Sequence, residues 1–120
     1  MDRAHIGRTA EDVAADFLQQ QGLELLQRNY RRRGGELDLV ARTGDVLVIV
    51  EVRTRATESF GGAAASVDGW KQHKIVRAAT LLLQQHKSLA RLRVRFDVVV
   101  VHEPQSEQPR VEWIRHAFEA

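Results

Sequence analysis

Residues 34 to 55 read GGELDLVARTGDVLVIVEVRTR, and this stretch predicts two β-strands joined by a tight turn. Leu37, Leu39 and Ala41 alternate with the residues between them, which is the pattern of a half-buried strand. Residues 46–50 are apolar without a break, as expected for a strand that is covered on both faces. Gly44 can adopt a positive φ, so we expect the turn at residues 42–45.

The length of this turn decides which acidic side chains meet. A four-residue loop would place Asp38 opposite Ile49 and Glu36 opposite Glu51, since cross-strand partners share a face of the sheet. Asp38 would then lie diagonal to Glu51, close enough for both carboxylates to reach one cation, with Arg53 on the same side. An odd-length loop would put Glu51 on the opposite face.

Glu51 is informative because a carboxylate within a Val/Ile run is costly to bury unless its charge is compensated. A metal ion or a salt bridge would compensate it. Alternatively, Glu51 marks the end of the strand and pairs with Arg53 or Arg55 in solvent. The residues alone favour neither the metal site nor the salt bridge.

Gly35-Glu36-Leu37-Asp38, the apolar strand and Glu51-Val52-Arg53 together resemble the core of the restriction-endonuclease-like superfamily, whose pattern is a carboxylate, a spacer and then Glu/Asp-x-Lys. The whole chain is similar to the YraN family of small bacterial proteins, which resemble archaeal Holliday-junction resolvases and are regarded as endonucleases by analogy. The matching positions run from residue 7 to 97 and include Glu11, Asn29, Arg55, Lys71, Lys74 and the two motifs.

The resemblance implies a three-layer α/β fold with a mixed sheet of about five strands flanked by two helices. It further implies a DNA endonuclease that depends on Mg²⁺ or Mn²⁺. Asp38 and Glu51 would hold the ion together with the Val52 carbonyl, and Glu11 or Glu36 would supply a further ligand or orient water.

Arg53 departs from the superfamily pattern, which has lysine at this position. A lysine can give up a proton and activate water, whereas a guanidinium stays charged and cannot act as a base. We therefore expect Arg53 to orient water or to stabilise the transition state electrostatically.

Two helices are expected on either side of the strands just described. Thr9 and Asp12 have the spacing of a capping box for a helix that ends at Gly22. Glu11, in the first turn, favours the helix N-terminus electrostatically, or belongs to the site as the resemblance implies. Asp68 is expected to cap a second helix that runs to about residue 86, and residues 116–120 to form a terminal helical turn.

Basic residues gather at three places along the chain. Arg31, Arg32 and Arg33 precede the Gly-Gly pair and suit phosphate contacts, although such runs are usually solvated. Lys71 and Lys74 form a basic stripe on the second helix, which is a second candidate for contact with the nucleic-acid backbone, as the resemblance also implies, or is a solvated face. Arg55, after the central strand, is expected to bind nucleic acid as well. Beside this stripe, residue 70 is a tryptophan that would stack on a base or, more commonly, pack at the boundary of the core.

Composition limits the remaining possibilities. The 120 residues suffice for one domain, spanning 1–120, with a modest core. The net charge is only +2, so any basic surface must arise from segregation of charge. There is no cysteine, which fits a reducing cytoplasm, and no apolar run approaches the length of a membrane span.

We therefore expect a metal-dependent endonuclease on DNA, with nucleic acid as partner, and the resemblance to resolvases implies branched or flapped DNA as the substrate. The alternatives are a nucleic-acid-binding module that keeps the fold without efficient catalysis, and a protein-interaction domain. A homodimer would suit a resolvase-like activity, because two strands must be cut.

Overall fold

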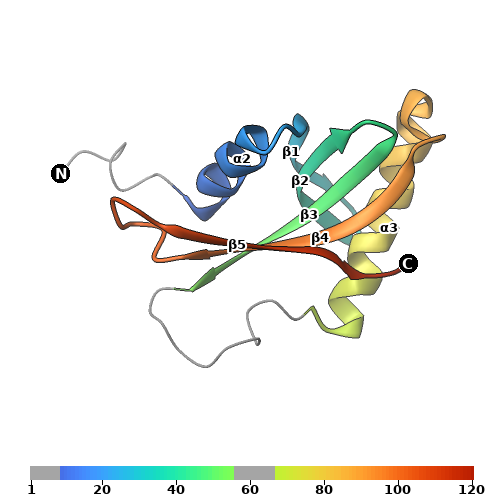
Figure 1. The fold of residues 1–120 in the computed structure, drawn as a ribbon. Coiled ribbons are helices and arrows are strands. Elements are labelled where there is room, and N and C mark those ends of the chain that lie inside the picture. Colours follow the sequence, from blue (N-terminus) through green and yellow to red (C-terminus); the bar gives the residue numbers. More distant parts are fainter. Residues whose placement is uncertain (1–8, 56–66) are drawn as a thin grey trace.

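The computed structural model describes residues 9–55 and 67–120. Five strands form one sheet in the order β1-β2-β3-β4-β5, with a helix packed on each face (Figure 1). The predicted α/β class, a mixed sheet of five strands with two flanking helices, is confirmed and is compatible with a restriction-endonuclease-like core. The elements in chain order are α2 (Ala10–Gln20), β1 (Glu24–Arg32), β2 (Gly35–Thr43), β3 (Val46–Arg55), α3 (Gly69–Gln85), the 3-10 helix η2 (Lys87–Leu89), β4 (Arg93–His102) and β5 (Arg110–Phe118).

The sheet is mixed because β3 and β4 run parallel, while the other neighbouring strands are antiparallel. A parallel pair needs a long crossover connection, and α3 lies in the connection between β3 and β4. This crossover brings the start of α3 toward the end of β3. Lys71 of α3 therefore lies near Glu51 of β3.

Both helices begin as the sequence predicts. The Thr9 hydroxyl accepts a hydrogen bond from the Asp12 N–H, and the Asp12 carboxylate accepts one from the Thr9 N–H, each at 3.1 Å. The Asp68 carboxylate accepts from the Lys71 N–H at 2.8 Å and caps α3. Within residues 9–55 and 67–120, no helix is both long and apolar enough to span a bilayer.

The two faces of the sheet carry separate cores. On the α3 side, Leu47 and Ile49 of β3 pack with α3 residues such as Ile75. On the α2 side, the alternate β3 residues Val48 and Val50 pack with α2. Glu51 follows Ile49 by two residues, so regular alternation directs it to the α3 side.

The C-terminal segment differs from the prediction. Residues 116–120 do not form a helical turn, because β5 continues to Phe118. The buried Asp97 carboxylate accepts hydrogen bonds from the Trp113 indole N–H and the His116 backbone N–H, both at 2.9 Å, and Arg95 pairs with both of its oxygens. These long-range bonds hold the segment on β4, which local sequence periodicity cannot reveal.

Candidate functional site

Asp38 and Glu51 are the first residues beyond the paired part of β2 and β3. The β2–β3 ladder ends at the Leu39–Val50 pair, and the same register continued by one residue sets Asp38 directly opposite Glu51. The four-residue loop predicted from the sequence is wrong, since the turn consists of residues 44 and 45 alone. Both loop lengths are even, so Glu51 keeps its expected face, and the two residues are direct rather than diagonal neighbours.

Asp38 lies where the alternation of β2 is interrupted. Leu37 belongs to the core under α3, whereas Leu39 and Ala41 belong to the core under α2, so the prediction that all three share a face is wrong. Here the Asp38 carboxylate accepts a hydrogen bond from the Val52 N–H at 2.8 Å. The N–H and C=O of a strand residue point toward the same neighbour, so the Val52 carbonyl also faces the Asp38 side of β3.

Glu51 is a buried carboxylate, with 7% of its surface exposed. The Lys71 ammonium group lies 3.2 Å from Glu51 Oε1. Burial, followed by repulsion from Asp38, raises the pKa of Glu51 to about 7, although Lys71 acts in the opposite direction. A further positive charge beside Glu51 would therefore keep its carboxylate ionised at neutral pH.

Arg53 follows Glu51 by two residues and lies on the same face of β3. Its Nε is 4.0 Å from Glu51 Oε1, and this buried nitrogen has no hydrogen-bond partner in the described structure. Buried donors are rarely left unpaired, so this N–H is an unusual feature of the site, although a third of the Arg53 side chain is exposed. Arg53 remains a cation in any contact that it makes.

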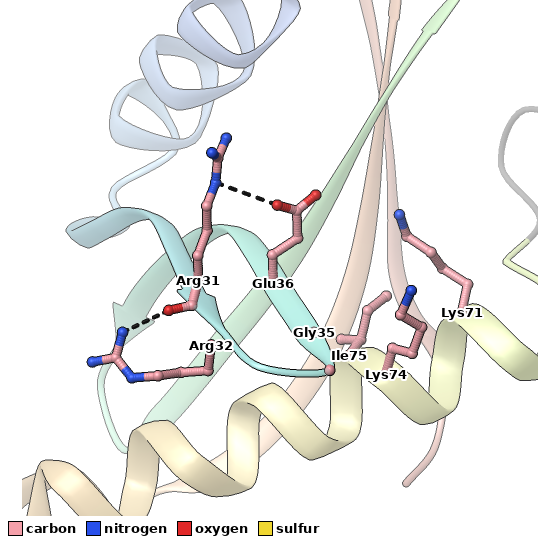
Figure 2. Close-up of a pocket in the computed structure, with 8 residues that line it drawn as sticks. Arg31, Arg32, Gly35, Glu36, Lys71, Lys74 and Ile75 are labelled. Carbon is pink, nitrogen blue, oxygen red and sulfur yellow. Dashed lines mark hydrogen bonds and ion pairs between the residues drawn. The ribbon is translucent and has the colours of Figure 1, made fainter.

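A pocket of about 350 Å³ opens between the β1–β2 turn and the first turns of α3. Figure 2 shows Lys71 and Lys74 projecting from α3 on the same side as Glu36 projects from β2, with Arg31 beside it. Arg31 Nε lies 3.3 Å from Glu36 Oε2. Because it both lines this pocket and contacts Glu51, Lys71 connects the pocket to the carboxylate pair. The lining residues are Arg31, Arg32, Gly34, Gly35, Glu36, Lys71, Lys74 and Ile75.

Gly35 allows the turn to approach the helix this closely. A Cβ atom at residue 35 would overlap the Lys74 carbonyl oxygen and would also crowd Ala78. Gly34 has a φ of +88°, a conformation that side chains other than glycine rarely adopt. The Gly-Gly pair thus shapes one wall of the pocket.

The other basic residues predicted from the sequence contribute less directly to this pocket. The Arg32 guanidinium stacks over the Tyr30 ring at 4.3 Å and donates to Gln85, so part of its role is to pack β1 against α3. Arg33 is exposed between β1 and β2, and Arg55 ends β3. The structure therefore brings Arg31, Lys71 and Lys74 to the pocket more directly than Arg33 or Arg55.

Glu11 is held by β1. Its carboxylate accepts hydrogen bonds from Arg28 Nε at 3.0 Å and Asn29 Nδ2 at 2.9 Å. Asn29 has a φ of +54°, and the β1–β2 register sets it opposite Asp38. Glu11 is thus linked through Asn29 to the strand position beside Asp38, and Glu36 is linked to Arg31 in the pocket.

Sequence reasoning did not identify the link between Lys71 and Glu51. Lys71 was expected to contact nucleic acid or to lie on a solvated face, yet it compensates the buried carboxylate. The two residues lie 20 positions apart in the chain, with the undescribed residues 56–66 between them, so no local spacing signals the contact. The unusual backbone of Asn29 could be suspected only from its residue type, since asparagine adopts a positive φ more readily than most residues.

The donor set at this site consists of two carboxylates and a backbone carbonyl. No group of three or more His, Cys, Asp and Glu side chains gathers in the described part of the chain. Hard oxygen donors suit Mg²⁺ or Mn²⁺, and proteins commonly bind Mg²⁺ through one or two carboxylates, with waters and substrate phosphates completing the shell. Asp38, Glu51 and Val52 therefore fit such an ion.

Comparison with known proteins places the chain among uncharacterised relatives. Residues 10–101 match the family model described as "Uncharacterised protein family UPF0102". A UPF0102 protein of Pseudomonas putida KT2440 is 47% identical over 113 residues, which cover 94% of this chain and 91% of the relative. One from Stutzerimonas stutzeri A1501 is 48% identical (95% and 94% covered), and one from Xanthomonas euvesicatoria is 50% identical (98% and 94% covered).

Proposed function

The chain belongs to UPF0102, an uncharacterised protein family, and we propose that it is a divalent-metal-dependent endonuclease acting on DNA. The observation that carries this proposal is the buried carboxylate of Glu51, which meets Asp38 at the end of a strand ladder. A basic pocket lies next to this pair and is joined to it by Lys71. Two acidic groups beside clustered cations are what phosphodiester hydrolysis with a metal ion requires.

Asp38, Glu51 and the Val52 carbonyl would hold the ion. When bound, Mg²⁺ or Mn²⁺ would polarise the scissile phosphate and lower the pKa of an attacking water. Burial of Glu51 and its repulsion by Asp38 favour the binding of a cation, because a cation stabilises both ionised carboxylates. The hydrogen bond from the Val52 N–H fixes the orientation of Asp38.

Cationic residues would hold the DNA backbone and stabilise charge that develops on the phosphate. Arg53 supports this role because a third of its side chain is exposed and its Nε lies 4.0 Å from Glu51 Oε1. Arg31, Lys71 and Lys74 line the pocket and would contact neighbouring phosphates. Since the chain carries a net charge of only +2, this local cluster matters more than the overall charge.

The test is cleavage of a flapped or four-way DNA with Mg²⁺ or Mn²⁺ by the wild type and by Asp38→Asn and Glu51→Gln. Each substitution removes a charge and nearly preserves shape, so we expect cleavage to fall ~100-fold or more. Asp45→Asn is the matched control, because Asp45 is an exposed acid in the β2–β3 turn that pairs with Arg93. Unchanged cleavage by Asp38→Asn would refute the proposal.

A second candidate function is a nucleic-acid-binding module without catalysis, and Arg53 favours it. A guanidinium at this position cannot act as a base. This function predicts DNA affinity that falls with salt but no cleavage with either metal. It further predicts that Asp38→Ala strengthens DNA binding, since one negative charge near the phosphates is removed.

A further inference from the structure

Trp70 is an exposed aromatic residue at the start of α3. It exposes 72% of its surface. Leu26, the other exposed large hydrophobic residue in the described structure, exposes 37%. Tryptophan is usually well buried, because its large apolar surface is costly to leave in water. The helix places Ile75 and Ala78 in the core and directs Trp70 away from it. Trp70 thus adds nothing to the core that explains a tryptophan here.

The ring of Trp70 lies beside Lys74, which lines the basic pocket. Lys74, one helical turn further on, holds its ammonium group 5.8 Å from the ring centroid. Lys74 also lines the pocket, together with Lys71, which contacts Glu51. A continuous set of side chains therefore runs from an exposed ring, through two cations, to the carboxylate pair.

An exposed ring beside cations is the arrangement with which proteins bind nucleic acid that is not base-paired. Cations hold the phosphates, and the ring stacks on the face of a base. In continuous duplex DNA both faces of each base are covered by neighbouring bases, so a ring at the surface has no face to contact. An unpaired base offers that face.

We propose that Trp70 stacks on an unpaired base of DNA and so selects DNA with unpaired nucleotides over continuous duplex. The inference rests on the proposed function, because it identifies the class of DNA that reaches the same site. Phosphates flanking the unpaired base would lie against Lys74 and Lys71. The strand would then lead from Trp70 toward Glu51.

The test compares three probes of about 12 nucleotides, a length within the range of common single-strand sites. The probes are a single strand, the same strand in a blunt duplex, and a strand of abasic residues with the same backbone charge. Affinity is measured without metal for the wild type, Trp70→Leu, which removes the ring, and Trp70→Phe, which keeps one. Fluorescence is followed in the same samples, since the chain has only one other tryptophan, at residue 113.

We expect Trp70→Leu to bind the single strand ~10-fold more weakly than the wild type, and Trp70→Phe to recover most of this loss. The duplex and the abasic strand should bind all three proteins alike. Quenching of fluorescence by the single strand should be absent in Trp70→Leu. Equal affinity of the wild type and Trp70→Leu for the single strand, or an equal loss with the abasic strand, would overturn the inference.

Failure of the proposed function would look different. If the wild type cleaves no DNA, the nuclease proposal fails, but the metal-free comparison of probes still reports on Trp70. If cleavage occurs and Trp70→Leu discriminates between the probes as the wild type does, only the role of Trp70 is refuted. Asp45→Asn is a control, because Asp45 is an exposed acid in the β2–β3 turn and its loss should leave the preference for unpaired DNA unchanged.

Discussion

Replacing Glu51 by glutamine should make the protein's stability less sensitive to pH. The pKa of this carboxyl group is near 4.5 when unperturbed and about 7 in the folded protein, chiefly because the side chain is buried. Between these values the folded state holds a proton that the unfolded state has released. Stability from this group is therefore present below about pH 4.5 and is lost as the pH rises through about 7.

The magnitude follows from the two pKa values. One pKa unit corresponds to ~1.4 kcal/mol, so the complete shift amounts to ~3 kcal/mol of unfolding free energy. Glu51→Gln cannot titrate and does not undergo this loss. The free energy of unfolding of the variant, relative to the wild type, should thus rise by ~2–3 kcal/mol between about pH 5 and about pH 8.

The assay is urea denaturation of both proteins across this pH range without metal. Taking the difference between variant and wild type cancels the titration of the groups that do not interact with Glu51. If the difference in unfolding free energy stays constant within ~0.5 kcal/mol from about pH 5 to about pH 8, the argument is refuted, because the pKa of Glu51 is then not raised in the folded protein.

Lys71 provides a second perturbation of the same equilibrium. Its ammonium group lowers the pKa of Glu51, so Lys71→Met should raise that pKa further and move the loss of stability to higher pH. Lys74→Met is the matched control, since Lys74 lies over the Trp70 ring one turn away. A transition at the same pH in Lys71→Met and the wild type would contradict the contact with Glu51.

Two further substitutions test the fold around the site. Gly35→Ala should destabilise the protein by ~1–3 kcal/mol, because the new Cβ overlaps the Lys74 carbonyl oxygen. As a control, the new Cβ in Gly69→Ala meets no atom within 4 Å and should change the urea midpoint little. Equal midpoints for the two variants would count against this packing. Asp97→Ala should cost ~3–5 kcal/mol in the same assay, because it leaves the partly buried Arg95 without its partner and removes two hydrogen bonds from β5. A loss under ~1 kcal/mol would contradict that role.

The strand pattern of residues 34–55 was sufficient to predict the centre of the sheet, but not its register. Hydrophobic alternation specifies which face a residue occupies, and loops of two and four residues give the same faces. Asp38 and Glu51 could therefore be expected on one face of the sheet without the knowledge that they lie directly opposite. The alternation of β2 is interrupted at Asp38, which accepts a hydrogen bond from the Val52 N–H, and the sequence has no periodic signal for this interruption.

Contacts between distant segments account for the other differences. N-cap hydrogen bonds are local, so the starts of α2 and α3 were predicted correctly. The extension of β5 depends on Asp97, which lies on the neighbouring strand, and the pairing of Lys71 with Glu51 depends on the β3–α3 crossover. Such contacts follow from the tertiary fold and have no fixed spacing in the chain.

The most direct test of the central claim is a calorimetric titration of Mg²⁺ and Mn²⁺ into the wild type and the Asp38→Asn, Glu51→Gln double variant. The titration is made alone and again with a short flapped DNA, because substrate phosphates contribute ligands to Mg²⁺. The account predicts metal binding to the wild type that is abolished in the double variant, while Asp45→Asn binds as the wild type does. Equal binding by the wild type and the double variant, or no binding by the wild type at millimolar metal with DNA present, would contradict it.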